Sequence, residues 1–166
     1  MCGIVGYVGR RDAARILVEG LERLEYRGYD SAGIAVCPNG AAPRVQIRKA
    51  AGRLQRLREV LAREPVDPAP IGIGHTRWAT HGRPTDANAH PHADAGGEFV
   101  VVHNGIIENY MQLRRWLSEL GYGFRTDTDT EVVPVLLRHC YKGDLVEAVR
   151  EAVAHLRGAY ALAILS

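Results

Sequence analysis

Residues 1–9 read Met-Cys-Gly-Ile-Val-Gly-Tyr-Val-Gly, and this stretch decides where the fold begins. Its apolar run, residues 4–8, is short and bracketed by glycines, which predicts a buried strand that starts almost at the N-terminus. Asp12 then provides a helix N-cap, and apolar residues recur at three- and four-residue spacing from Ala14 as far as Gly28. The first 28 residues therefore predict a strand followed at once by a helix.

The same patterns continue outward along the chain and alternate between strand and helix. Strands are predicted at residues 31–36 and 45–50, joined as a hairpin by Pro38-Asn39-Gly40, and at residues 71–77, 99–104 and 160–165. Helices are predicted from Leu54 to the proline-rich segment at 65–70, from Tyr110 to Gly121, from Thr130 (as N-cap) to Tyr141, and from Asp144, which forms a capping box with Glu147, to Leu156. This order favours an α+β fold in which strands are grouped in sheets under helical layers.

Composition narrows the class of protein. The chain has 166 residues, of which 46% are hydrophobic and 24% charged, as in an ordinary single globular domain. A net charge of +2 indicates neither a nucleic-acid partner nor a membrane surface, and no apolar run approaches the ~20 residues that a membrane span needs. Three scattered cysteines favour a reducing compartment, so we expect a cytoplasmic protein. The last strand ends with the chain and has no polar tail, which suggests a fragment of a longer protein.

Cys2 is the first candidate for chemistry. Removal of Met1 would place a thiol and a free α-amine on one residue, and an amine that titrates near ~8 can act as general base toward its own thiol. Modest help from a nearby cation would then give useful thiolate, because a free thiol titrates near ~8.5. A chance buried cysteine is the simpler interpretation of Cys2 taken alone.

Two further motifs lie at predicted strand ends. In residues 75–82, Arg77 offers a planar guanidinium that suits a carboxylate, and Trp78 offers a large apolar lid. The same sequence is also compatible with a strand-end arginine paired to a surface acid and with Trp78 in the core. In residues 103–105, the amide of Asn104 and the backbone N–H of Gly105 could converge on an oxyanion, or the pair could form a simple turn.

Acidic and histidine-rich segments leave two more possibilities open. Residues 126–131 resemble a helix-capping segment, but one of their aspartates could accept an ammonium group. His81, His90, His92 and Asp94 share the long loop before residue 99 and suggest a metal site. Because the chain has neither a helical histidine pair nor an HExxH motif, we favour solvated or structural histidines, with no metal and no cofactor.

Together, several motifs in order resemble one family over nearly the whole chain: the N-terminal glutaminase domain of glutamine–fructose-6-phosphate aminotransferases, also called glucosamine-6-phosphate synthases. They are MCGIVG at 1–6, LEYRGYDSAG at 24–33, HTRWATHG at 75–82, NAHPH at 88–92 and VHNGIIEN at 102–109.

The resemblance implies a four-layer αββα sandwich of the N-terminal-nucleophile hydrolase type, truncated at its C-terminus and followed in the full-length chain by sugar isomerase domains. It implies that Cys2 attacks the side-chain amide of L-glutamine, and that the ammonia released converts fructose 6-phosphate to glucosamine 6-phosphate. The site residues it implies are Asn104 and Gly105 (oxyanion hole), Arg77 (substrate carboxylate), Asp129 (substrate ammonium), Thr80 and His81 (glutamine pocket) and Trp78 (gate of the ammonia channel). The full-length enzyme is expected to be a homo-oligomer.

Three alternatives stay open at this point. The glutaminase domain of amidophosphoribosyltransferase shares the N-terminal cysteine and the Asn-Gly pair. A non-catalytic glutamine-binding module would keep the pocket without the chemistry, and retention of Met1 would favour it. A metal hydrolase would be sensitive to chelators.

Overall fold

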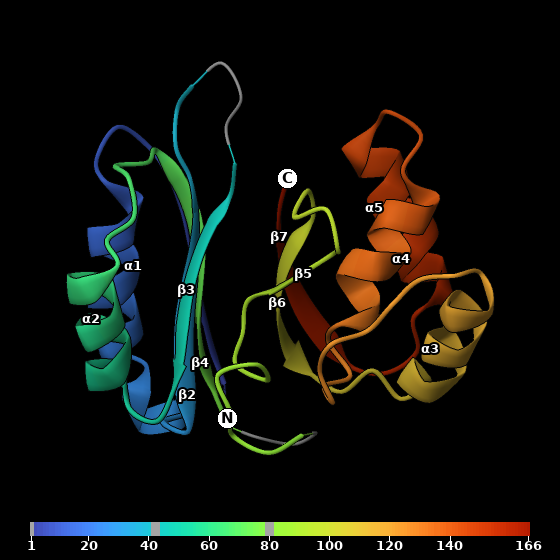
Figure 1. Ribbon diagram of the computed structural model, residues 1–166, viewed down its shortest axis with the longest axis horizontal. Coiled ribbons are helices and arrows are strands. Elements are labelled where there is room, and N and C mark those ends of the chain that lie inside the picture. Colours follow the sequence, from blue (N-terminus) through green and yellow to red (C-terminus); the bar gives the residue numbers. More distant parts are fainter. Residues whose placement is uncertain (1, 41–43, 79–81) are drawn as a thin grey trace.

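A computed structural model describes residues 2–40, 44–78 and 82–166. Thr80 and His81, two of the predicted site residues, lie outside these ranges. Figure 1 shows four layers stacked in order: a helical layer, a first sheet, a second sheet and a second helical layer. The outer helices on one side are α1 (Ala13–Glu22) and α2 (Leu54–Arg63), and those on the other side are α3 (Tyr110–Glu119), α4 (Val132–Cys140) and α5 (Leu145–His155). The α+β class and the layered arrangement expected from the sequence are confirmed.

The first sheet is antiparallel and has the strand order β1-β4-β2-β3. Its strands are β1 (Gly3–Val8), β2 (Ser31–Cys37), β3 (Gln46–Ala51) and β4 (Ile71–Arg77). The hairpin of β2 and β3 is confirmed, with Ser31 opposite Ala51. The prediction that residues 4–8 are buried is wrong, because β1 lies at the sheet edge; Val8 is 78% exposed.

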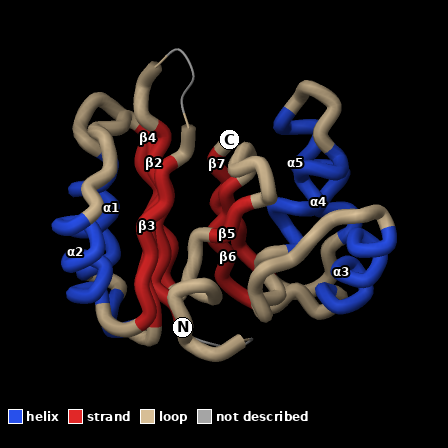
Figure 2. The backbone as a smooth tube through the Cα atoms, viewed as in Figure 1, coloured by secondary structure: helices blue, strands red, loops and turns tan. Residues whose placement is uncertain are grey.

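The second sheet has the order β5-β6-β7 and is also antiparallel. It contains β5 (His92–Ala93), β6 (Val100–Gly105) and β7 (Tyr160–Leu165). The strands β6 and β7 were predicted, whereas β5 was not, because two residues have no readable period. As Figure 2 shows, the long segment before β6 passes between the two sheets before it reaches β5.

The observed helices confirm the predicted N-caps Asp12 and Asp144, and they correct one predicted helix end and one predicted N-cap. Asp12 accepts a bond from the backbone N–H of Ala14 over 3.3 Å, and Asp144 accepts one from Glu147 over 3.0 Å. The first helix ends at Glu22 rather than running on to Gly28, and a short 3₁₀ helix, η1 (Glu25–Arg27), follows it. None of the helices within residues 2–40, 44–78 and 82–166 is long and apolar enough to cross a bilayer.

The N-cap of α4 is Glu131, not Thr130 as predicted. The hydroxyl of Thr130 is engaged elsewhere, because its Oγ1 lies 2.9 Å from Nδ1 of His103 and 3.1 Å from Nε2 of His90. Tertiary hydrogen bonds therefore take precedence over the local capping preference of threonine.

Three apolar interfaces hold the four layers together. The first packs α1 and α2 on the first sheet through residues such as Leu17, Leu21 and Leu57. The second lies between the sheets and includes Ile73 and Val102. The third packs α3, α4 and α5 on the second sheet and is the largest.

The alternation of side chains along a strand determines which polar residues face the space between the two sheets. Side chains on alternate positions of a strand share a face. Because Ile73 of β4 packs between the sheets, His75 and Arg77 point toward the same interface. Because Val102 of β6 packs there too, Asn104 faces them from the second sheet. The two sheets thus bring predicted site residues together at one end of the sandwich.

Candidate active site

Cys2 lies directly before β1 and beside the end of β4, since Gly3 pairs with Thr76. The backbone N–H of Trp78 donates to Sγ of Cys2 over 3.2 Å, and the thiol lies 3.6 Å from the carbonyl oxygen of Trp78. Gly3 permits this approach, because a Cβ there would lie 2.8 Å from Cβ of Leu24 and 2.9 Å from the hydroxyl of Thr76. The side chain of Cys2 is partly buried, so it is not the fully buried residue that the simpler interpretation supposed.

The electrostatic environment of Cys2 differs from the expectation. Burial raises the pKa of the Cys2 thiol, whereas the hydrogen bond from Trp78 and the charge of Arg77 act in the lowering direction without reversing the shift. Burial of the thiol therefore opposes the thiolate that the sequence led us to expect. A base must remove the proton before this sulfur can attack.

Asn104 reaches Cys2 from the second sheet. Its Nδ2 donates to the carbonyl oxygen of Cys2 over 3.2 Å, and its Oδ1 lies 2.9 Å from Nε2 of His75. Gly105 follows with a φ of +114°, and a Cβ there would collide with the backbone of Ala159 and Tyr160. Both residues pair with β7, so the interpretation of Asn104-Gly105 as a simple turn is wrong.

Arg77 ends β4 and is buried, at 4% exposure, so it is not a surface ion-pair residue. One of its terminal nitrogens donates to the carbonyl oxygen of Gly82 over 3.1 Å. Gly28 packs on the same strand end, where a Cβ would lie 2.8 Å from the carbonyl carbon of Arg77. Gly82 thus holds the guanidinium of Arg77, while Gly28 lets its own segment pack against the backbone of Arg77.

Trp78 is not a core residue, because its side chain is 49% exposed. Its ring makes an edge contact with Tyr29 at a centroid distance of 5.7 Å. An exposed aromatic pair beside the sulfur fits the lid expected from the sequence better than the core alternative.

Asp129 is buried, at 4% exposure, and its Oδ2 accepts a bond from the backbone N–H of Ile107 over 2.9 Å. The segment that carries Asp129 also contacts the segment that follows Arg77. The side chain of Asn88 exchanges hydrogen bonds with Asp127. Gly82 packs against both Asn88 and Asp127. Glu131 is the N-cap residue of α4, but its side chain accepts from the backbone N–H groups of Arg125 and Thr126 and makes no capping bond to the helix.

Sequence reasoning did not predict the contacts of three further residues around the candidate site. His75 contacts Asn104, Asn88 ties the Asp129 segment to the long loop, and Lys49 donates to the carbonyl oxygens of Ala87, Ala89 and Pro91. Burial lowers the pKa of Lys49 to about 8. These contacts are long-range, so the only signal in the sequence was the unusual density of polar residues in a loop between two strands.

His90 and His92 are engaged in contacts with other side chains of the fold. His90 stacks on His75 at 4.1 Å between centroids and makes an edge contact with His92 at 4.8 Å. His92 lies 3.3 Å from the hydroxyl of Thr128. In the ranges that the structure describes, no group of three or more His, Cys, Asp or Glu side chains could hold a metal ion; His81 lies outside those ranges. The metal hydrolase alternative thus gains no support there.

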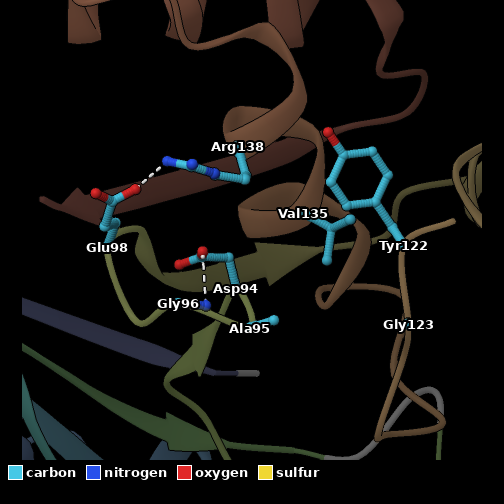
Figure 3. A pocket seen from close by; sticks show the side chains of 8 residues that line it. All are labelled: Asp94, Ala95, Gly96, Glu98, Tyr122, Gly123, Val135 and Arg138. Carbon is cyan, nitrogen blue, oxygen red and sulfur yellow. Dashed lines mark hydrogen bonds and ion pairs between the residues drawn. The ribbon is translucent and has the colours of Figure 1, made fainter. Parts of the chain in front are cut away.

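A cavity of about 450 Å³ opens elsewhere, between the segment that joins β5 to β6 and the helix α4; Figure 3 shows the side chains that line it. Its polar groups are already engaged: Asp94 accepts from Gly96 and Phe99, and Arg138 pairs with Glu98. Because it lacks Cys2, Asn104 and Arg77, we place the active site at the sheet ends and not in this cavity.

A family model described as "Glutamine amidotransferase domain" matches residues 75–166, more than half of the chain. The chain therefore belongs to the glutamine amidotransferase domain family.

Curated relatives narrow the resemblance. The chain is 60% identical over 164 residues to the glutamine–fructose-6-phosphate aminotransferase [isomerizing] of Symbiobacterium thermophilum, covering 99% of this chain and 26% of that protein. It is 57% identical over 165 residues to the protein of the same name from Caldanaerobacter subterraneus, again with 99% and 26% covered. The chain thus spans about a quarter of the length of these relatives, and the resemblance stated from the motifs is confirmed.

Among solved structures, the chain matches the glutamine phosphoribosylpyrophosphate amidotransferase of B. subtilis, complexed with ADP and GMP. The TM-score is 0.82 at 27% identity, covering all of this chain and 35% of that one. The fold is thus shared with that amidotransferase, whereas the sequence identity to the two glutamine–fructose-6-phosphate aminotransferases is higher, at 60% and 57%.

Proposed function

We propose that this chain, once Met1 is removed, hydrolyses the side-chain amide of L-glutamine with Cys2 as the nucleophile. The observation that carries the proposal is the convergence of three groups from distant parts of the chain. The N–H of Trp78 donates to the sulfur of Cys2 and the amide of Asn104 donates to the Cys2 carbonyl oxygen, at the place where β1 begins and where β4 and β6 end. A nucleophile beside fixed N–H donors is the arrangement that acyl transfer requires.

The proposed reaction has two stages. The free α-amine of Cys2 accepts the thiol proton, and the sulfur attacks the amide carbon of glutamine, so that a C–S bond forms and the carbonyl electron pair moves to oxygen. Asn104 and Gly105 stabilise that oxyanion. The C–N bond then breaks, the amine returns its proton, and ammonia leaves. Water hydrolyses the thioester to glutamate and restores the thiol.

Substrate binding follows from the flanking charges. Arg77 would hold the α-carboxylate, because its fork matches two carboxylate oxygens, and Asp129 would hold the α-ammonium. Both side chains are buried, which strengthens such contacts by excluding water. Thr80 and His81 are proposed to complete the pocket, and Trp78 to close the exit for ammonia.

In the full-length protein we propose that the ammonia aminates fructose 6-phosphate to give glucosamine 6-phosphate in sugar isomerase domains. The support is the 55–60% identity to aminotransferases of that name. A cytoplasmic homo-oligomer without nucleic-acid or membrane partners is proposed on the same ground. The amidophosphoribosyltransferase alternative has support only from the shared fold.

The test compares two cysteine variants of the processed chain in an assay of glutamate and ammonia release. We expect Cys2→Ala to abolish release and Cys37→Ala to keep it, because Cys37 lies at the far end of β2, beside Arg44 and Tyr141. Release that survives Cys2→Ala would overturn the proposal. Glutamine binding without release by the processed wild-type chain would favour the binding-module alternative.

A further inference from the structure

His75 is a buried histidine that the proposed mechanism does not use, although it contacts the oxyanion-hole residue. We propose that His75 is a positioning residue whose Nε2–H fixes the amide of Asn104 with its nitrogen toward Cys2 and the substrate oxygen. This inference rests on the proposed function, because it assigns His75 a role in that reaction. His75 acts through Asn104 and does not itself touch the substrate.

The hydrogen-bond partners determine which atoms of His75 and Asn104 act as donors. Nε2 of His75 lies 2.9 Å from the carbonyl oxygen of His103, which can only accept, so Nε2 carries the proton. The Asn104 atom that lies 2.9 Å from the same nitrogen must then be the amide oxygen. The amide nitrogen consequently faces the carbonyl oxygen of Cys2, at 3.2 Å, which again can only accept.

Packing holds the ring of His75 in the orientation in which Nε2–H faces Asn104. His75 is fully buried and stacks on His90 with an angle of 29° between the ring planes. His90 is anchored in turn by the hydroxyl of Thr130, while Lys49 holds the carbonyl oxygens of Ala89 and Pro91 on either side of it. Burial also keeps His75 neutral, because it lowers the pKa of His75 to about 3.

The orientation matters because the two ends of an asparagine amide have opposite polarity. With the nitrogen toward Cys2, one N–H bonds the Cys2 carbonyl and the second is left for an oxyanion. With the amide turned over, a carbonyl oxygen would face the developing negative charge and repel it. Apart from the Cys2 carbonyl, His75 is the partner that distinguishes these two orientations in the described part of the chain.

Steady-state glutamine hydrolysis by the processed chain tests the role of His75 with a donor-deleting and a donor-keeping substitution. His75→Met should lower kcat by ~10- to 100-fold and change KM by less than about threefold, since the lost interaction acts in the transition state. His75→Gln, which keeps a donor near the position of Nε2, should recover much of that loss. His139→Met is the matched control, because its ring contacts Trp116 and Tyr122 behind α3 and should leave kcat unchanged.

A double-mutant cycle separates positioning from general damage. In the Asn104→Ala background, His75→Met should cost less than about twofold in kcat, because the group it orients is gone. Equal losses in both backgrounds, or no recovery with Gln, would overturn the inference while leaving the glutaminase proposal intact. A processed wild-type chain that releases no glutamate would overturn both.

Discussion

The backbone N–H of Trp78 donates to Sγ of Cys2 over 3.2 Å, and this bond joins the end of β4 to the residue that precedes β1. A hydrogen bond to sulfur is stronger when the sulfur is ionised, so Trp78 favours the thiolate once a base has taken the proton. The same strand end also holds Arg77, which places the proposed substrate contact one residue from the proposed nucleophile contact.

Substitution of Asn104 by alanine should slow the reaction far more than it weakens binding. Loss of one oxyanion donor typically lowers kcat by ~100- to 1,000-fold, whereas the ground-state carbonyl gains little from that donor. Steady-state kinetics of glutamine hydrolysis give both constants. Equal losses in kcat and in glutamine affinity would remove Asn104 from the oxyanion hole.

Arg77→Lys should fail to preserve glutamine affinity, although it keeps the charge. A lysine ammonium cannot offer the two parallel donors of a guanidinium, and loss of one charged hydrogen bond corresponds to about 10-fold or more in KM. Arg138→Lys, at an exposed ion pair with Glu98, is the control and should leave KM unchanged. Near wild-type affinity in Arg77→Lys would show that Arg77 does not hold the carboxylate.

Gly105→Ala should destabilise the fold as well as the site. Its φ of +114° is unfavourable for a residue with a Cβ, and that atom would meet the backbone of Ala159. We expect a loss of about 2 kcal/mol or more in the free energy of unfolding. Gly121→Ala has a similar φ of +92° but open space around it, so it should lose only about 1 kcal/mol. Urea unfolding measures both, and equal losses would mean that close packing at Gly105 is unimportant.

Acid should destabilise the protein below pH ~6.5, before most carboxylates titrate. Burial lowers the pKa of His75 to about 3 and holds those of His90 and His92 well below the usual range. The unfolded chain therefore binds protons at these histidines that the folded chain does not, so stability is complete above pH ~6.5 and falls as pH drops toward the folded pKa values. Each histidine contributes up to about 1.4 kcal/mol per pH unit in this window.

Urea unfolding at pH 7, 6 and 5 measures this slope, and the His92→Gln variant provides its control. Removal of one buried titrating ring should make the slope shallower by about 1.4 kcal/mol per pH unit. A free energy of unfolding that stays constant between pH 7 and pH 5 would contradict the assignment of neutral buried rings.

Local patterns were enough to predict most elements of the fold. The strand at residues 71–77 has the predicted bounds, and Asp12 and Asp144 cap the helices as expected, because these features depend on neighbouring residues alone. The exposure of β1 and the existence of β5 depend on which strands lie beside them, and sequence periodicity does not contain that information.

The candidate site divides in the same way. Cys2, Arg77 and Asn104 could be named from the chemistry of their side chains, whereas Asp129 was singled out among the neighbouring acids only by the family resemblance. The role of His75 could not be predicted, because it depends on facing Asn104 across two sheets, 29 residues away in the sequence. The raised pKa of Cys2 was also missed, since burial by distant segments is absent from a local pattern.

The central claim is that the N-terminal cysteine is the nucleophile toward glutamine. An intact-mass spectrum of the purified protein after incubation with a diazo-ketone analogue of glutamine, followed by peptide mapping, tests it most directly. The account predicts a chain that lacks Met1 and carries one adduct, located on Cys2. A processed chain that forms no adduct, or forms it on Cys37 or Cys140, would contradict the account.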